Sequence, residues 1–222
     1  MNIPCSQICN YLNLPLQGSD VAFNAVSTDT RSIQPGALFI AIKGANFDGH
    51  DYIAEALAKG AAGLVVSKPY TANVPVLVVA DTLWAYGQIA AMHRAKFKIP
   101  VVAVTGSCGK TTVQSMVASI LRGVGNTLSP SGSFNNEIGL PRTLLQLTEE
   151  HKFAVLEMGA RKSGDIKYLM EIVNPQVTLV NNVAPAHTET FGDLDTIART
   201  KGEIYSYLQS TGTAIINVDD AY

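Results

Sequence analysis

The sequence is poor in cysteine, in long hydrophobic runs and in net positive charge, and each shortage excludes a class of protein. Its 3 cysteines, Cys5, Cys9 and Cys108, are odd in number and lack the spacing of metal ligands, so no disulfide scaffold is expected. No apolar run approaches the ~20 residues that span a bilayer, which argues against membrane insertion. With 16 Lys and Arg against 18 Asp and Glu, a net charge of −2 offers no basic surface for nucleic acid. The first residues, Met1–Ser6, carry no export signal, so we expect a cytoplasmic protein.

The remaining composition predicts a folded α/β protein. Hydrophobic residues make up 47% of the 222 residues and charged residues 15%, enough for a sizeable core in one large or two modest domains. Strand patterns alternate with helix patterns, which is typical of α/β folds. In the first half we expect strands at Leu38–Ile42, Leu64–Val66 and Val76–Val79, and helices at Asp51–Lys59 and Leu83–Ala95.

A short polar linker, KFKIP at Lys96–Pro100, separates the first half of the chain from the second. Nearly unmixed apolar runs follow it, and such runs suit parallel strands that are buried on both faces. The runs are VVAV from Val101, FAVL from Phe153, VTLV from Val177 and TAIIN from Thr213. We therefore expect a small N-terminal α/β domain over residues 1–97 and, over residues 98–222, a P-loop ATPase-like domain with a mostly parallel sheet flanked by helices.

The sharpest local signal is VVAVTGSCGKTT, from Val101 to Thr112. A buried strand enters a turn in which Gly106 and Gly109 let backbone N–H groups point inward, and a helix follows whose N-terminus attracts phosphate. Lys110 would reach the β- and γ-phosphates of a nucleotide, and the Thr111 hydroxyl would hold Mg²⁺. The alternative is a plain strand-to-helix turn. The apolar stripe of the helix consists of Val113, Met116, Val117, Ile120 and Leu121.

Polar residues also follow two other buried strands. Glu157 ends the FAVL strand, and a hard oxygen ligand at the carboxyl edge of a parallel sheet suits Mg²⁺. Asn181, Asn182 and His187 follow the VTLV strand in the same way. The alternative for Glu157 is a solvated glutamate at the end of a strand, and the alternative for His187 is a solvated residue in a loop; neither would then have a functional role.

Lys201 interrupts the apolar face of a helix between Leu194 and Leu208. A lysine in this position either snorkels to solvent or is a buried amine. Burial favours the neutral amine, which reacts with CO₂ to form a carbamate, and a carbamate is a carboxylate-like ligand for Mg²⁺. The residues of that apolar face are Leu194, Ile197, Ala198, Ile204, Tyr205 and Leu208.

The phosphate loop lacks the first glycine of the longer P-loop, since Val104 stands there, and its short form, Thr105-Gly106-x-x-Gly109-Lys110-Thr111-Thr112, resembles that of the Mur ligase superfamily. These are ATP-dependent amide-forming enzymes of cell-wall synthesis. Other segments resemble the family in the same order along essentially the whole chain. They are Ser27-Thr-Asp29-Thr-Arg31, Asp48-Gly49-His50, Asn135-Asn136-Glu137, Glu157-Met-Gly159-Ala160, Gly164-Asp-Ile, Asn181-Asn-Val-Ala-Pro-Ala-His187 and Ala198-x-x-Lys201-Gly-Glu203.

The resemblance implies roles at the matching positions. Lys110, His187 and Lys201 would be catalytic. Asn135 and Asn136 would lie near the γ-phosphate of ATP, and Asn217 near its adenine. The phosphate-binding loop would comprise Thr105, Gly106, Ser107, Cys108, Gly109, Lys110, Thr111 and Thr112. The Mg²⁺ ligands would be Thr111 and Glu157 for one ion, and His187 with carbamylated Lys201 for a second. The UDP-binding region would include Ser27, Thr28, Asp29 and Arg31, whereas Asp48-Gly-His50 would equally suit a turn and cap.

The implied reaction has two steps. ATP phosphorylates the terminal carboxylate of UDP-MurNAc-tripeptide, and the amine of D-Ala-D-Ala then displaces the phosphate. Segments Asn135–Pro141 and Glu157–Ala160 favour this dipeptide-adding member of the family over the amino-acid-adding ligases and the folylpolyglutamate synthases. A monomer is expected. Because the family continues past position 222 into a third domain, which is absent here, the chain alone is expected to lack turnover. The alternative of another class is a nucleotide or UDP-sugar binding module.

Overall fold

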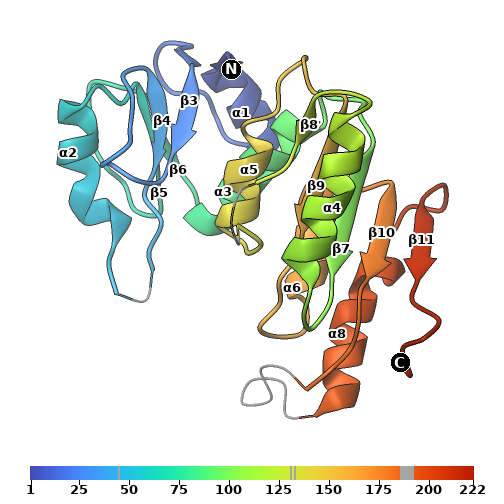
Figure 1. Cartoon of the computed structure of the whole chain (residues 1–222). Helices are drawn as coiled ribbons and strands as arrows, with labels where there is room; N and C mark the ends of the chain where they lie inside the picture. The colour runs from blue at the N-terminus through green and yellow to red at the C-terminus, as the bar shows by residue number, and fades with distance from the viewer. Residues whose placement is uncertain (45, 131, 133, 186–192) are drawn as a thin grey trace. The chain divides into compact units, whose positions relative to one another are not determined.

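The structure is a computed structural model that describes residues 1–44, 46–130, 132, 134–185 and 193–222. The chain divides into two compact units, Met1–Met92 and His93–Tyr222, which Figure 1 colours from blue to green and from green to red. This division falls within helix α3 (Thr82–Arg94), shortly before the boundary that the sequence predicts at residue 97. The predicted limits of the functional domains stay a prediction.

Unit 1 contains a four-stranded sheet in the order β3-β4-β5-β6, in which every pair is parallel. The strands are β3 (Ala25–Ser27), β4 (Ala37–Ile40), β5 (Gly63–Val66) and β6 (Val76–Val78). The other elements are β1 (Ile3–Pro4), α1 (Cys5–Leu12), β2 (Ala22–Phe23), the 3₁₀ helix η1 (Gly49–Tyr52), α2 (Ile53–Ala58) and α3. The apolar runs predicted as strands are thus β4, β5 and β6. One face of this sheet packs Phe39, Leu64 and Val66 against Ile53 and Ala56 of α2.

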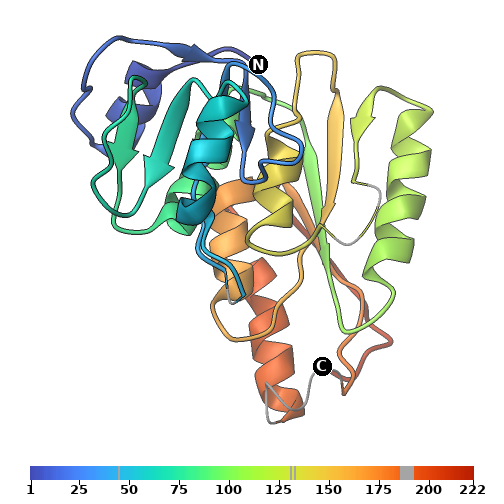
Figure 2. The same cartoon turned by 90° about the vertical axis from the view of Figure 1, so that its left-hand side faces the viewer.

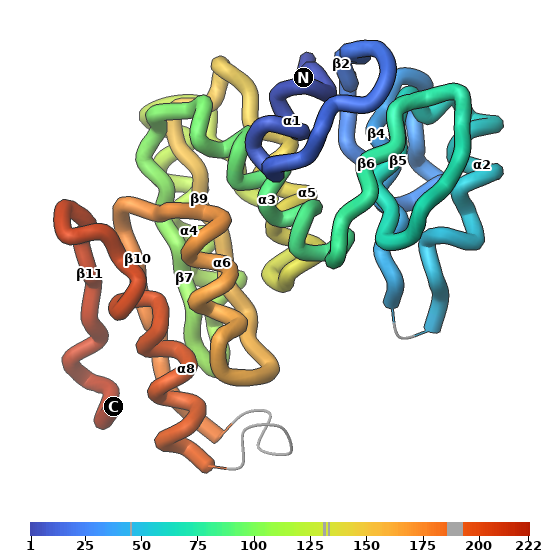
Figure 3. The backbone as a smooth tube through the Cα atoms, turned by 180° about the vertical axis from the view of Figure 1, so that it is seen from behind, coloured from blue at the N-terminus to red at the C-terminus, as the bar shows by residue number. Residues whose placement is uncertain are grey.

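Unit 2 contains a five-stranded sheet in the order β11-β10-β7-β9-β8, again with every pair parallel. The strands are β7 (Val101–Thr105), β8 (Thr127–Leu128), β9 (Phe153–Glu157), β10 (Val177–Val180) and β11 (Thr213–Ile216). The helices are α4 (Lys110–Arg122), α5 (Gly139–Leu144), α6 (Asp165–Val173) and α8 (Leu194–Ser206). All four apolar runs predicted as strands are confirmed, and so is the parallel α/β architecture. Helix α4 lies on one face of the sheet, and α6 and α8 lie on the other (Figures 2 and 3).

Two expectations about burial in unit 2 are wrong. On α4 the buried residues are Gln114 and Ala118, whereas Met116 and Ile120 of the predicted stripe are 62% and 71% exposed. On the buried side of the helix the Gln114 side chain donates from Nε2 to Val155 O at 3.2 Å. Strand β11 is the second case, since all four of its residues are exposed at the edge of the sheet.

The tight approach of η1 to β4 predicts a steric effect at Gly49. A Cβ on this buried glycine would lie 2.8 Å from both the N and the O of Ile42. We expect Gly49→Ala to lower the free energy of unfolding by about 1–3 kcal/mol, as overpacking does. The control is Gly202→Ala in the interior of α8, where an added Cβ would meet no atom within 4 Å. This substitution should raise the free energy of unfolding by about 0.5–1 kcal/mol. Urea unfolding of both variants tests this, and equal stabilities would contradict it.

Candidate functional site

The loop between β7 and α4 is shaped to receive an anion. β7 ends at Thr105 and α4 begins at Lys110. Gly109 has a φ of 74°, and a Cβ here would lie 2.8 Å from Asn181 Nδ2, so only glycine fits without strain. The first N–H groups of α4 have no intrahelical partner and form the positive end of the helix dipole. Such a loop binds phosphate.

The segment after β10 braces this loop. The N–H groups of Ser107 and Cys108 donate to the backbone O and the side-chain Oδ1 of Asn182, at 2.9 and 3.0 Å. Asn181 Nδ2 donates to Cys108 O at 2.9 Å, and Ser107 Oγ donates to Ala184 O at 2.8 Å. The conformation of the loop is therefore held by the protein itself. The sequence predicts the place of the two asparagines at the strand end, but not this bracing.

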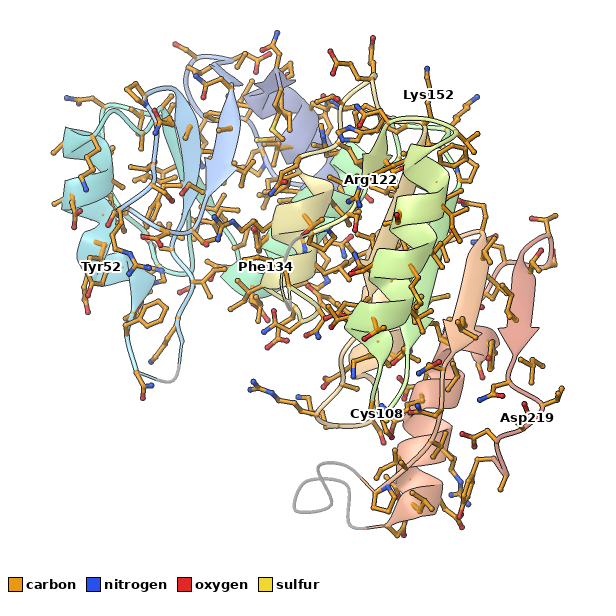
Figure 4. The ribbon with its side chains drawn as sticks, viewed as in Figure 1. Tyr52, Cys108, Arg122, Phe134, Lys152 and Asp219 are labelled. Atoms are coloured by element: carbon orange, nitrogen blue, oxygen red, sulfur yellow. The ribbon has the colours of Figure 1, made fainter. Side chains whose placement is uncertain are left out.

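Lys110 supplies positive charge over the loop. Its Nζ donates to Gly106 O at 2.9 Å, so the ammonium group lies beside the backbone of the loop rather than extending into solvent. Figure 4 shows Cys108 in the same loop and Asp219 after β11, both beyond the carboxyl ends of the strands. Ligands of open α/β sheets bind at this edge.

Glu157 places a buried carboxylate next to the loop. It ends β9, is 1% exposed, and pairs with Val104 of β7. Its Oε2 accepts a hydrogen bond from Thr111 Oγ1 at 2.7 Å, and its Oε1 accepts one from Asn135 Nδ2 at 2.7 Å. Hard oxygens from a carboxylate and a hydroxyl are donors that Mg²⁺ accepts, so Glu157 and Thr111 fit this ion.

Lys201 lies on the buried face of α8, as its place in the apolar stripe predicts, and it is 6% exposed. Burial, the largest cause, and the charge of Lys110 lower the pKa of Lys201 to about 8, while Cys108 acts in the opposite direction. Among the residues that the structure describes, none donates to or accepts from its Nζ. This placement matches the buried amine and not a lysine that snorkels to solvent.

Other predicted site residues have structural contacts of their own. Asn136 Oδ1 accepts from Gly139 N at 2.8 Å and so caps α5. Asn217, after β11, donates from Nδ2 to Asn181 O at 2.8 Å. His187 lies outside the described residues. Within the described ranges, no group of three or more His, Cys, Asp and Glu gathers at one place.

A cavity of 280 Å³ adjoins the bracing segment, beyond the ends of β10 and β11. Its polar lining comes from Asn182, Asn217 and Asp220, and Val180 and Ile216 are among its apolar lining residues. No role for Asp220 was predicted from the sequence, and its Oδ2 accepts from Val183 N at 2.9 Å. The cavity therefore shares its wall with the brace of the phosphate loop.

Comparison with models of known protein families shows which family the chain belongs to. The model of the Mur ligase middle domain matches residues 104–222, and the model of the Mur ligase family catalytic domain matches residues 22–104. The chain belongs to the Mur ligase family.

Individual Mur ligases are similar to it over nearly its whole length. The UDP-N-acetylmuramoyl-tripeptide--D-alanyl-D-alanine ligase of Escherichia coli is 47% identical over 99% of this chain and 49% of its own length. A crystal structure of MurF from Acinetobacter baumannii matches with a TM-score of 0.95 at 37% identity, over 100% of this chain and 50% of that one. The structure of MurF from Thermotoga maritima in complex with ADP matches with a TM-score of 0.80 at 31% identity, over 88% of this chain and 46% of that one. The chain thus spans about half the length of these relatives.

In this Mur ligase chain, the residues predicted for UDP binding lie at the carboxyl end of β3 in unit 1. Ser27 Oγ donates to Asp29 O at 3.0 Å. The Arg31 guanidinium pairs with both oxygens of Asp29, with 2.7 Å between the closest atoms, and its side chain is 87% exposed. Thr28 lies between Ser27 and Asp29 in the same turn. Asp29 thus engages Nε and Nη2 of the guanidinium and holds the exposed side chain in one orientation.

The Asp48-Gly49-His50 segment has the structural role of a turn and cap. Asp48 Oδ1 accepts from the backbone N of His50 at 3.0 Å and contacts His50 Nδ1 at 2.6 Å. His50 Nε2 accepts from Ser67 N at 2.9 Å, which fixes the proton on Nδ1. These bonds tie the start of η1 to the end of β5.

The burial of Lys201 predicts a specific dependence of stability on pH. Since the folded pKa is depressed to about 8 from 10.5, the ammonium form costs stability below pH 8, and this cost fades as the pH rises toward 10.5. Lys201→Met removes this cost. The free energy of unfolding of the variant should therefore exceed that of the wild type by on the order of 3 kcal/mol near pH 7 and by much less near pH 10. Unfolding in CO₂-free buffers measures the gap, with exposed Lys98→Met as the control. A gap that is constant with pH would contradict the prediction.

None of the helices that the structure describes has the length and apolarity required to span a bilayer.

Proposed function

We propose that the protein is an ATP-dependent ligase that joins D-Ala-D-Ala to UDP-MurNAc-tripeptide in peptidoglycan precursor synthesis. One observation carries the proposal: the phosphate loop, the buried Glu157 and the buried Lys201 converge at one edge of a sheet. They do so in a chain 47% identical to the E. coli ligase of that specificity. We place the reaction in the cytoplasm and the enzyme as a monomer.

In this proposal the nucleotide lies along the carboxyl edge of the sheet in unit 2. The N–H groups at the start of α4 and the Lys110 ammonium bind the β- and γ-phosphates. The adenine occupies the 280 Å³ cavity beside Asn217. Support comes from the ADP complex of the T. maritima relative, which is 31% identical.

The metal sites follow from the oxygen donors. Thr111 and Glu157 hold one Mg²⁺, and Asn135 orients the Glu157 carboxylate through Oε1. Lys201, once carbamylated, and His187 hold a second. Bound Mg²⁺ neutralises charge, so that two anions, the substrate carboxylate and the γ-phosphate, can approach each other.

The chain's own residues act chiefly by positioning. The braced loop and Lys110 hold the γ-phosphoryl group in line with the terminal carboxylate of the tripeptide, and its transfer gives an acyl phosphate. The amine of D-Ala-D-Ala then attacks the acyl carbon, the amide forms, and phosphate leaves. Arg31 and the turn from Ser27 to Asp29 bind the UDP portion of the substrate.

Removal of the loop cation tests the nucleotide site. Lys110→Ala should weaken ATP binding by about a hundredfold, because a charged contact in such a site is worth on the order of 3 kcal/mol. Titration calorimetry measures the affinity, and an assay with ATP, UDP-MurNAc-tripeptide and D-Ala-D-Ala measures the amide product. Exposed Lys98→Ala is the matched control.

Normal ATP affinity in Lys110→Ala would overturn the nucleotide site. Because the chain alone is expected to lack turnover, the amide assay decides only on a protein that also carries the remaining half of its relatives' length; there, ATP binding without amide product would favour the binding-module alternative.

Glu157→Gln tests the metal site without a change of shape. The amide keeps one oxygen but loses the charge, so we expect Mn²⁺ binding in the presence of ADP, followed by electron paramagnetic resonance, to weaken by at least about tenfold. Glu171→Gln, at an exposed position on α6, is the control. Equal Mn²⁺ affinity in the two variants would remove Glu157 from the metal site.

A further inference from the structure

Glu203 joins two segments that are far apart in the sequence. Its Oε1 accepts a hydrogen bond from Gly164 N at 2.8 Å, and its Oε2 accepts one from Lys167 N at 2.9 Å. Both donors belong to the first turn of α6, whose Ncap is Gly164. A carboxylate that accepts two N–H groups at the positive end of a helix is a strong contact.

Two weaker contacts lie on either side of this clasp between α8 and α6. Ser163 Oγ and Thr200 Oγ1 are 3.1 Å apart. Lys167 Nζ lies 5.2 Å from the centre of the Tyr207 ring, within the range of a cation–π interaction. Contacts at positions 200, 203 and 207 run along one side of α8, so they restrain both its rotation and its shift along the axis.

Lys201 projects from a different side of the same helix. Residues two apart in an α-helix are separated by about 200° around the axis, so Glu203 and Lys201 face nearly opposite ways. The amine is close enough to Lys110 and Cys108 for their charges to affect its pKa, and it has no bond of its own to a described residue. Its position therefore depends on how α8 is held.

We propose that Glu203 is a positioning residue: its clasp on the first turn of α6 fixes the rotation of α8 and thereby holds Lys201 buried at the phosphate loop. The inference rests on the proposed function only for the use made of Lys201. The clasp itself is a matter of geometry, so it can be tested without ligation.

The test is the accessibility of the Lys201 amine. The wild-type chain is treated briefly near pH 10 with a water-soluble acetylating reagent, so that the lowered pKa of Lys201 gives this amine little advantage in neutral form, and peptide mass spectrometry gives the rate at each lysine. In the wild type Lys201 should react more slowly than exposed Lys98 and Lys162. In Glu203→Ala its rate should rise by at least about tenfold, since the loss of charged hydrogen bonds permits α8 to turn. Glu203→Gln, which keeps one acceptor oxygen, should give an intermediate rate.

Gly164→Ala tests the clasp from the other side without any change of charge. Gly164 has a φ of 90°, and a Cβ there would meet no atom within 4 Å, so alanine strains only the backbone that presents the N–H. Its matched control is Gly18→Ala in unit 1, with a φ of 83° and equally open space. Lys201 should become more reactive in the first variant and stay unchanged in the second. Glu171→Ala, on the exposed side of α6, should also leave it unchanged.

An unchanged rate at Lys201 in Glu203→Ala and Gly164→Ala would overturn the proposal. A uniform rise at the lysines of unit 2 would also overturn it, because it would assign Glu203 to general stability. If Glu203→Ala fails to fold, Glu203→Gln and Gly164→Ala decide the matter. Normal ATP affinity in Lys110→Ala would count against the proposed function and leave the acetylation result standing.

Discussion

The parallel pairing of β7 with β10 on one side and β9 on the other is the constraint on which the candidate site depends. The register places Thr105 opposite Val180 and Val104 opposite Glu157. Everything that follows these strands therefore meets at one edge, however far apart it lies in the sequence. A slip of one residue between β7 and β9 would turn the Glu157 side chain to the other face of the sheet and break its bond to Thr111.

Two positive charges lie close together at this edge. Among the described residues, the Lys110 ammonium donates to a backbone carbonyl, Lys201 is buried near it, and Glu157 accepts hydrogen bonds from Thr111 and Asn135. The repulsion between the two lysines is one cause of the lowered pKa of Lys201. A polyphosphate in the loop would relieve this repulsion, and so would conversion of the Lys201 amine to a carbamate. The same repulsion thus supports both features of the proposed mechanism.

The sequence predicts what depends on local pattern and misses what depends on distant partners. Apolar runs locate four of the five strands of the larger sheet, all but β8, and helical spacing predicts the buried position of Lys201. Spacing failed on α4, whose buried face carries Gln114 bonded to Val155 O, while Met116 and Ile120 are exposed. The bracing of Cys108 by Asn182 joins residues 74 positions apart, and no local pattern records such a contact.

Helix α8 connects β10, β11 and α6 of unit 2 through side-chain hydrogen bonds. The Tyr205 hydroxyl accepts from Val180 N at 2.9 Å and donates to Ile215 O at 2.7 Å, which fastens the helix to β10 and β11. Glu203 fastens it to α6. With the helix held on two sides, Lys201 can remain in an apolar setting that its ammonium form disfavours. The free energy that keeps this amine beside the phosphate loop therefore comes from its neighbours on the helix, and the amine itself is left free of hydrogen bonds to the described residues.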